Sequence, residues 1–156
     1  MQDSRYQAPR AHILLVERNQ GALELLETML CWKGYQVTTA VDGLDGLEKF
    51  RNGHFQLILT NLSTARLSGW ELCRRVKSSE RSVPVALVTG LDFGASPAHS
   101  PFDVIFPEPF QFDEFQGLIE SLIQCKAAAD NNQGPENGAQ AAAVNSESPV
   151  NAVSQM

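Results

Sequence analysis

Polar side chains follow short apolar runs of this chain, and Asn61 is the most informative of them. It comes directly after the run Leu57–Thr60, and Glu17 and Arg18 likewise follow His12–Val16. In open α/β sheets, ligands and chemistry are found outside the carboxyl ends of the strands, so a working residue is expected at Asn61. A neutral amide, however, is a poor nucleophile and a weaker ligand for hard cations than a carboxylate. The position predicts a site, and the residue type lacks the usual reactive group.

Five apolar or β-branched runs alternate with segments whose apolar residues recur at helical spacing. The predicted strands are His12–Val16, Tyr35–Ala40, Leu57–Thr60, Val85–Thr89 and Asp103–Phe106. The predicted helices are a first one ending at Gly34, a second from Leu44 to about Asn52, a third from near Trp70, and a last one over Phe110–Lys126. This alternation predicts a parallel sheet with right-handed crossovers and helices on both faces. Periodicity alone leaves the strand order open.

Composition and charge argue against several classes of protein. The 156-residue chain carries a net charge of −6 and no basic run, which disfavours nucleic-acid binding. No apolar run approaches the roughly 20 residues of a membrane span, and the amino-terminal segment lacks the apolar core of a signal peptide. Cys31, Cys73 and Cys125 are too far apart to suggest a metal knuckle or redox pair. We expect a cytoplasmic protein that is monomeric or weakly dimeric.

Three regions differ in composition. Residues 1–10 form a polar arm, residues 11–126 carry the periodic runs, and residues 127–156 are rich in Ala, Asn, Gln, Ser and Gly without any aromatic residue. A segment of that last kind cannot bury enough apolar surface to offset its ordering entropy, so it is predicted to be disordered. The sequence therefore predicts one domain between a flexible arm and a low-complexity tail.

The stretch from Asn61 to Leu72 carries a family resemblance that extends from Ala11 to about Lys126. Asn61, Gly69 and the pair Glu71-Leu72 fall in register with the third strand, loop and third helix of the receiver domains of two-component response regulators. The resemblance implies a doubly wound, five-stranded parallel sheet of order 2-1-3-4-5, similar to flavodoxin. It also implies phosphoryl transfer to an aspartate, assisted by Mg²⁺ and by donors that take up the remaining charge.

Carried over position by position, the first half of the receiver site is altered. Glu17 and Arg18 fall on the acidic pair that would hold Mg²⁺, and Arg18 places a permanent cation there. Asn61 falls on the phosphoacceptor aspartate. Ser63 lies where a backbone carbonyl would contact the metal. The resemblance therefore leaves no catalytic residue and no metal ligand set, and Mg²⁺ binding is expected to be lost or weak.

The second half of the site keeps part of the pattern. Thr89 matches the Ser/Thr switch position, and Glu108 replaces the expected Lys before a retained Pro109, whose peptide bond is usually cis in the family. Ile105 falls where an aromatic switch residue often lies, and Phe106 is expected to point to the opposite face of its strand.

The charges of this pocket nearly balance without a metal. Glu17 and Glu108 contribute −2 and Arg18 contributes +1, against three carboxylates, one Lys and Mg²⁺ in a loaded receiver. We therefore expect Arg18 to pair with Glu17 or Glu108 and to fill the metal position; the alternative is that it extends into solvent, as exposed Arg usually does.

The segment Leu91–Phe102 departs from the family. Gly94, Pro97 and Pro101 interrupt any helix there. A shortened or missing fourth helix is predicted, and with it an altered partner surface.

The leading hypothesis is a receiver-like signalling module that acts without phosphorylation, through contact with a histidine kinase or another signalling protein, and that is not an enzyme. One alternative is regulation by Ser/Thr phosphorylation, for example at Ser63, Thr64, Ser68 or Ser146, or residual phosphoryl binding. Another is a small ligand-binding or enzymatic flavodoxin-like domain. That alternative is weakly supported, because the loop after the first strand has one Gly and no histidine has a partner at metal-ligand spacing.

Overall fold

A computed structural model of the chain describes residues 8–91 and 100–132. Five parallel strands form one sheet of order β2-β1-β3-β4-β5, which confirms the order that the receiver resemblance implied. The strands are β1 (His12–Val16), β2 (Gln36–Ala40), β3 (Leu57–Thr60), β4 (Val85–Thr89) and β5 (Val104–Pro107). β3 and β4 are buried along their whole length and β1 at every residue after His12, as expected for a parallel sheet covered on both sides.

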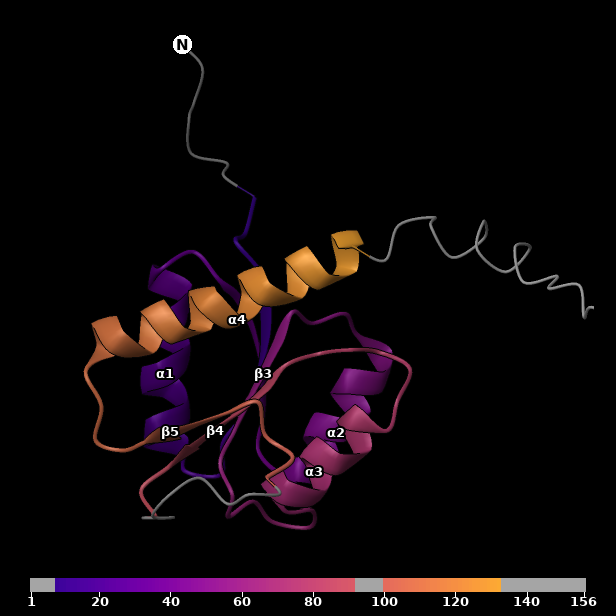
Figure 1. Ribbon diagram of the computed structural model, residues 1–156. Helices are drawn as coiled ribbons and strands as arrows, with labels where there is room; N and C mark the ends of the chain where they lie inside the picture. Colours follow the sequence, from indigo (N-terminus) through magenta and orange to yellow (C-terminus); the bar gives the residue numbers. More distant parts are fainter. Residues whose placement is uncertain (1–7, 92–99, 133–156) are drawn as a thin grey trace, which may run out of the picture.

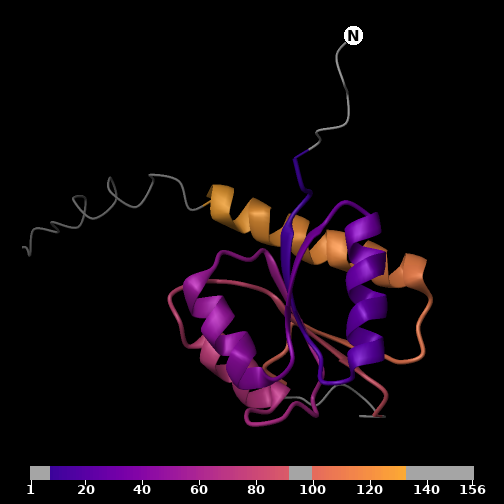
Figure 2. The same cartoon turned by 180° about the vertical axis from the view of Figure 1, so that it is seen from behind.

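Helices cover both faces of the sheet (Figures 1 and 2). The helices are α1 (Gln20–Trp32), α2 (Gly43–Asn52), α3 (Gly69–Lys77) and α4 (Phe112–Asn132). α1 and α4 share one face, while α2 and α3 share the other. α4 extends past the predicted end at Lys126 because Ala127–Ala129 are strong helix formers and continue the helix into the compositionally different segment.

Alternation along the strands divides the core into two clusters. In β1, Leu14 and Val16 pack toward α2 and α3, whereas Ile13 and Leu15 pack toward α1 and α4. In β5, Ile105 contacts the first cluster and Phe106 the second, so the predicted opposite orientation of these two residues is confirmed. The sheet is therefore fixed from both sides, and its strand ends are held at set positions.

Polar caps start three helices close to the carboxyl ends of the strands. Asn19 accepts a hydrogen bond from the Ala22 amide at α1, and Asp42 and Ser68 make the equivalent contacts at α2 and α3. At the other end of α1, Gly34 adopts φ 91°, a left-handed conformation that lets the chain turn into β2. The loops that carry the three caps thus lie at the carboxyl edge of the sheet, after β1, β2 and β3.

The connection from β4 to β5 falls partly outside the described residues. The described residues on either side, Gly90–Leu91 and Ser100–Asp103, contain no helix, and the predicted interruption at Gly94 and Pro97 lies in the undescribed part. Most of the predicted arm lies outside the described residues. The whole of the predicted tail beyond Asn132 does so too. Among the helices that the structure describes, none is long and apolar enough to cross a membrane.

Candidate functional site

The candidate site lies at the carboxyl edge of the sheet, where β1, β3, β4 and β5 end. Val16 and Thr60 are partners in the parallel pairing of β1 and β3, so Glu17 and Asn61 follow as neighbours on adjacent strands. Thr89 closes β4 and pairs with Pro107 of β5, directly before Glu108. The topology therefore brings together polar residues that are far apart in the sequence.

Glu17 is buried, with 5% of its surface exposed, and both of its carboxylate oxygens are occupied. Oε1 accepts a hydrogen bond from the Asn19 amide at 2.8 Å. Oε2 accepts one from Nδ2 of Asn61 at 3.1 Å. These neutral donors satisfy a buried charge that would otherwise be costly.

Both polar atoms of the Asn61 side chain form hydrogen bonds. Its Nδ2 donates to Glu17, and its Oδ1 accepts a hydrogen bond from the Ser63 amide at 3.3 Å. A Cβ on Gly69 would lie 2.2 Å from the Asn61 carbonyl oxygen, so only glycine permits the loop after β3 to approach this closely. The amide of Asn61 therefore points its donor group at the buried carboxylate.

Thr89 and Glu108 form the other side of the site. The Glu108 amide donates to the Thr89 carbonyl at 2.8 Å, and the Thr89 hydroxyl oxygen accepts from the Leu91 amide at 3.2 Å. The Glu108–Pro109 peptide bond is cis, as the resemblance implied. Partial burial, followed by the negative charge of Glu17, raises the pKa of the Glu108 carboxyl above its ordinary value. Two carboxylates thus share one edge of the sheet.

Arg18 does not occupy the position that its charge suggested. It is exposed, and the structure gives no ion pair between it and Glu17 or Glu108, all three being described residues. The prediction of an Arg18 pair in the metal position is wrong. The reason is visible at Glu17, because both carboxylate oxygens already accept hydrogen bonds and an exposed guanidinium keeps its hydration instead.

The oxygen atoms at the magnesium position that the receiver resemblance implies are engaged in hydrogen bonds within the protein. Hard cations take oxygen ligands, preferably several carboxylates. Here the buried carboxylate of Glu17 is engaged, and Asn61 directs a nitrogen donor toward it. No group of three or more His, Cys, Asp or Glu residues in the described part of the chain is arranged to hold a metal.

The pair Asp42 and Arg66 was not singled out from the sequence. Arg66, at φ 63°, donates from its guanidinium to Asp42 Oδ2 at 2.8 Å and 2.7 Å. The amide of Asp45, and then Arg66, hold the pKa of the Asp42 carboxyl below its ordinary value. An Asp followed three residues later by a second acidic residue is a typical N-cap pattern. The turn sequence Asp42-Gly43 and the following Asp45 therefore already indicated that Asp42 caps a helix. The pair ties the loop after β3 to the start of α2.

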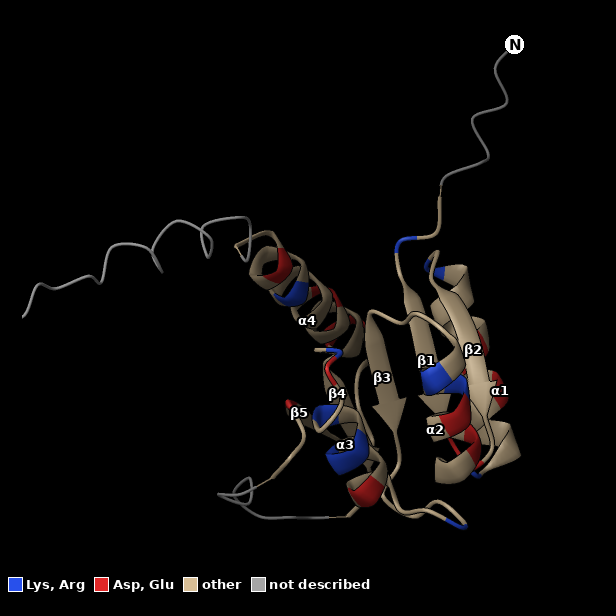
Figure 3. Ribbon diagram, turned by 90° about the vertical axis from the view of Figure 1, so that its right-hand side faces the viewer, with Lys and Arg blue, Asp and Glu red and all other residues tan. Residues whose placement is uncertain are grey.

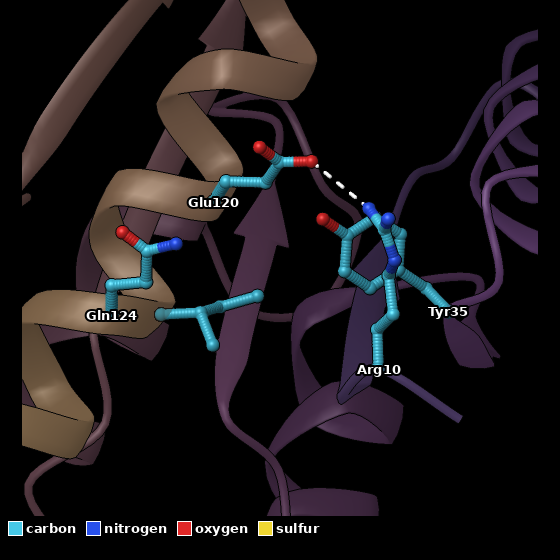
Figure 4. A pocket seen from close by; sticks show the side chains of 5 residues that line it. Arg10, Tyr35, Glu120 and Gln124 are labelled. Carbon is cyan, nitrogen blue, oxygen red and sulfur yellow. Dashed lines mark hydrogen bonds and ion pairs between the residues drawn. The ribbon is translucent and has the colours of Figure 1, made fainter. Parts of the chain in front are cut away.

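A separate pocket lies at the opposite, amino-terminal edge of the sheet (Figure 4). Arg10 pairs with Glu120 of α4 at 3.0 Å, and Tyr35 and Gln124 line the same hollow. Burial, with a smaller contribution from the Glu120 charge, raises the pKa of Tyr35. This ion pair links the segment before β1 to α4 and takes no part in the candidate site.

Sequence comparison decides the family. The family described as "Response regulator receiver domain" matches residues 13–95, which is more than half of the chain. The chain belongs to the response regulator receiver family. Within this receiver, Asn61 stands at the end of the strand that carries the phosphoacceptor in the resemblance described above.

Relatives and solved structures agree with this assignment. The chain is 30% identical over 128 residues to the response regulator ArlR of Staphylococcus aureus, a match that covers 76% of this chain and 55% of ArlR. This receiver therefore spans about half the length of that curated relative. It is similar to the receiver domain of a sensor histidine kinase from Pseudomonas aeruginosa, whose crystal structure holds magnesium in the active-site cleft (25% identity, TM-score 0.68, 73% of this chain and 98% of that one).

A second structure is similar to the same extent. The response regulator TrrA of Thermotoga maritima, solved in complex with Mg²⁺ and beryllofluoride, is 27% identical with a TM-score of 0.67, over 71% of this chain and 97% of TrrA. Both neighbours therefore carry magnesium in their structures.

Proposed function

We propose that this receiver is a signalling module that works without accepting a phosphoryl group. The observation that carries the proposal is the hydrogen bond from Asn61 Nδ2 to Glu17 Oε2, at 3.1 Å. Phosphoryl transfer needs a carboxylate nucleophile at the position that the resemblance assigns to Asn61, and Asn61 is a neutral amide. Its side chain also engages Glu17, the acidic residue that is kept from the expected acidic pair. Loss or strong weakening of Mg²⁺ binding is part of the same proposal.

The charge at Glu108 supports the proposal independently. A transferring phosphoryl group requires cations or donors around its oxygens. Glu108 supplies a second carboxylate close to that of Glu17. Arg18, which directly follows Glu17 in the sequence, is exposed. Such an edge disfavours an anionic ligand. The module would then act as a cytoplasmic, non-enzymatic protein that binds a histidine kinase or another signalling protein, with no role for nucleic acid.

Thermal unfolding with Mg²⁺ and beryllofluoride, a phosphoryl mimic, tests the proposal. A ligand that binds only the folded state raises the melting temperature by mass action. The native protein should show no shift relative to fluoride and Mg²⁺ without beryllium. The triple variant Arg18→Asp, Asn61→Asp, Glu108→Lys should shift upward. A shift of the native protein would contradict a phosphorylation-independent function.

A further inference from the structure

A pocket of about 320 Å³ opens at the amino-terminal edge of the sheet, between α4 and the residues that precede β1 and β2 (Figure 4). Arg10 lies before β1, and Tyr35 lies directly before β2. Glu120, Ile123 and Gln124 line the opposite wall from α4, where spacings of three and four residues place them on one helix face. The volume is at the lower end of the range for pockets that hold small molecules, so only a small ligand would fit.

The polar side chains of this pocket are held in place within the protein. The Arg10 amide donates to the Gly34 carbonyl at 3.0 Å, which fixes Arg10 beside the start of β2. Tyr35 is 5% exposed and belongs to the core cluster that faces α1 and α4. Glu120 Oε1 accepts hydrogen bonds from Arg10 Nη1 and Gln116 Nε2, both at 3.0 Å. A site that is ordered in advance loses less conformational freedom when a ligand binds.

The side chains that line the pocket keep groups with which a ligand can form hydrogen bonds. Between described residues, the ion pair uses only Nη1 of Arg10, which has five N–H donors, and Oε1 of Glu120. Gln124 is exposed, and its side-chain amide forms no hydrogen bond to another described residue. The Tyr35 hydroxyl lies beside Arg10 in Figure 4, and burial raises the pKa of Tyr35, so the hydroxyl remains a neutral donor at neutral pH. Donors and acceptors therefore face one small space.

We propose that this pocket binds a free α-amino acid with an apolar side chain, with the carboxylate on Arg10 and Tyr35 and the ammonium group on Glu120. An α-amino acid carries its two charges one carbon atom apart, and the pocket presents a cation and an anion 3.0 Å apart. Ile123 offers an apolar contact to the side chain of the ligand. The pocket lies at the opposite edge of the sheet from the candidate site, so this inference goes beyond the proposed function and does not depend on it.

The two opposite charges of the pocket select a zwitterion over a simple anion or cation. A carboxylate without an ammonium group would approach Arg10 and also face Glu120, and neighbouring like charges are unfavourable. A simple amine would face Arg10 in the same way. In an α-amino acid each charged group meets an opposite charge, and the Gln124 amide can donate to the carboxylate or accept from the ammonium group. The ligand would add to the ion pair between Arg10 and Glu120 without breaking it.

An NMR titration of the full, isotopically labelled chain tests the proposal, with L-leucine as the probe. Leucine should shift the backbone amide resonances of Arg10, Tyr35 and Gln124 saturably, with a Kd of about 1 mM, as expected for a small ligand in an open site. Two comparison ligands each lack one charge: isocaproate has no ammonium group, and isoamylamine has no carboxylate. At matched pH and ionic strength, each should bind at least about tenfold more weakly than leucine.

Matched variants separate the pocket from exposed ion pairs in general. Arg10→Gln and Glu120→Gln each remove one charge and should weaken leucine binding by about tenfold or more. Tyr35→Phe keeps the buried ring and removes only the hydroxyl, so it should weaken binding by about threefold to tenfold. Glu71 and Arg75 form an ion pair with the same 3.0 Å separation on α3, which covers the other face of the sheet from α4 (Figure 3). Glu71→Gln and Arg75→Gln should therefore leave leucine binding unchanged.

Four results would overturn the proposal: no saturable shift with leucine, equal binding of leucine and the two comparison ligands, equal effects of the pocket and α3 variants, or leucine shifts that spare the residues lining the pocket. The comparison of the three ligands uses the native protein, so it decides the proposal even if a variant fails to fold.

Discussion

Asn61→Asp introduces the carboxylate that the receiver resemblance places at this position, and it is expected to destabilise this protein. Nδ2 of Asn61 lies 3.1 Å from Glu17 Oε2, and Glu17 is 5% exposed. A hydrogen bond to a charged group contributes about 1.5–3 kcal/mol to stability, and the substitution removes it. Two carboxylate charges at about 3 Å repel by roughly 5 kcal/mol at an effective dielectric constant of 20, which is an upper bound because the new side chain can turn toward solvent.

The expected loss of unfolding free energy is therefore about 2–4 kcal/mol at pH 8. It should shrink toward pH 4, since like charges in contact raise the proton affinity of the pair and a shared proton restores a hydrogen bond. In linkage terms, the variant's folded state binds more protons than its unfolded state over this range, so stability falls as pH rises. Urea unfolding of the native protein and the variant at several pH values measures this difference.

The double variant Glu17→Gln, Asn61→Asp is the control, because the pair then carries one charge and should recover most of the loss at pH 8. Millimolar Mg²⁺ should stabilise Asn61→Asp more than the native protein, since two adjacent carboxylates offer hard-cation ligands. Equal stability of the native protein and Asn61→Asp at pH 8, with no dependence on pH, would refute the contact between Asn61 and Glu17.

Three further predictions concern residues that hold the site in place. Gly69→Ala should cost about 3 kcal/mol or more in urea unfolding, because its Cβ would lie 2.2 Å from the Asn61 carbonyl oxygen, whereas Gly117→Ala in α4 meets no atom within 4 Å and should gain roughly 0.5–1 kcal/mol. Asp42→Ala should cost about 2 kcal/mol at pH 7 through loss of the α2 cap and the Arg66 pair. Because the Asp42 pKa is lowered on folding, this contribution is complete above the ordinary carboxyl pKa and disappears as pH falls through the lowered value; a small, pH-independent effect would contradict it. Burial raises the pKa of Cys73 to about 11, so iodoacetamide should label the two exposed cysteines in native protein and Cys73 only after unfolding.

The strands and most of the helices could be predicted from local sequence, for physical reasons that can be named. Runs such as Leu57–Thr60 are short, apolar and bounded by polar residues, which suits a buried parallel strand. The strand order needed the family resemblance, because burial on both faces looks the same in every central strand. The end of α4 was misplaced, since composition changes at Ala127 while helix propensity does not.

The side-chain arrangement of the site was harder to predict than its position. Parallel strands place Glu17, Asn61 and Glu108 at one edge whatever their types. Whether Arg18 pairs with them depends on a competition that spacing does not reveal. The Glu17 carboxylate accepts hydrogen bonds from the Asn19 amide and the Asn61 side chain. The long, hydrated guanidinium of Arg18 would have to lose its hydration and its conformational freedom to displace these donors. Net charge therefore predicted a pair that local hydrogen bonding makes unnecessary.

The position of the site at the strand ends would allow its chemistry to change while the fold persists, as the proposed function requires. Most residues that fill the two hydrophobic clusters lie within the strands and helices, whereas Glu17, Asn61 and Glu108 come directly after the ends of β1, β3 and β5. A substitution there costs hydration or a hydrogen bond and leaves no cavity in the core. The compensation is also local, because Asn61 satisfies the carboxylate that a metal would otherwise neutralise. Reversing Glu108 or Asn61 alone therefore leaves an unpaired charge, and on this argument a working phosphoryl site requires the positions to change together.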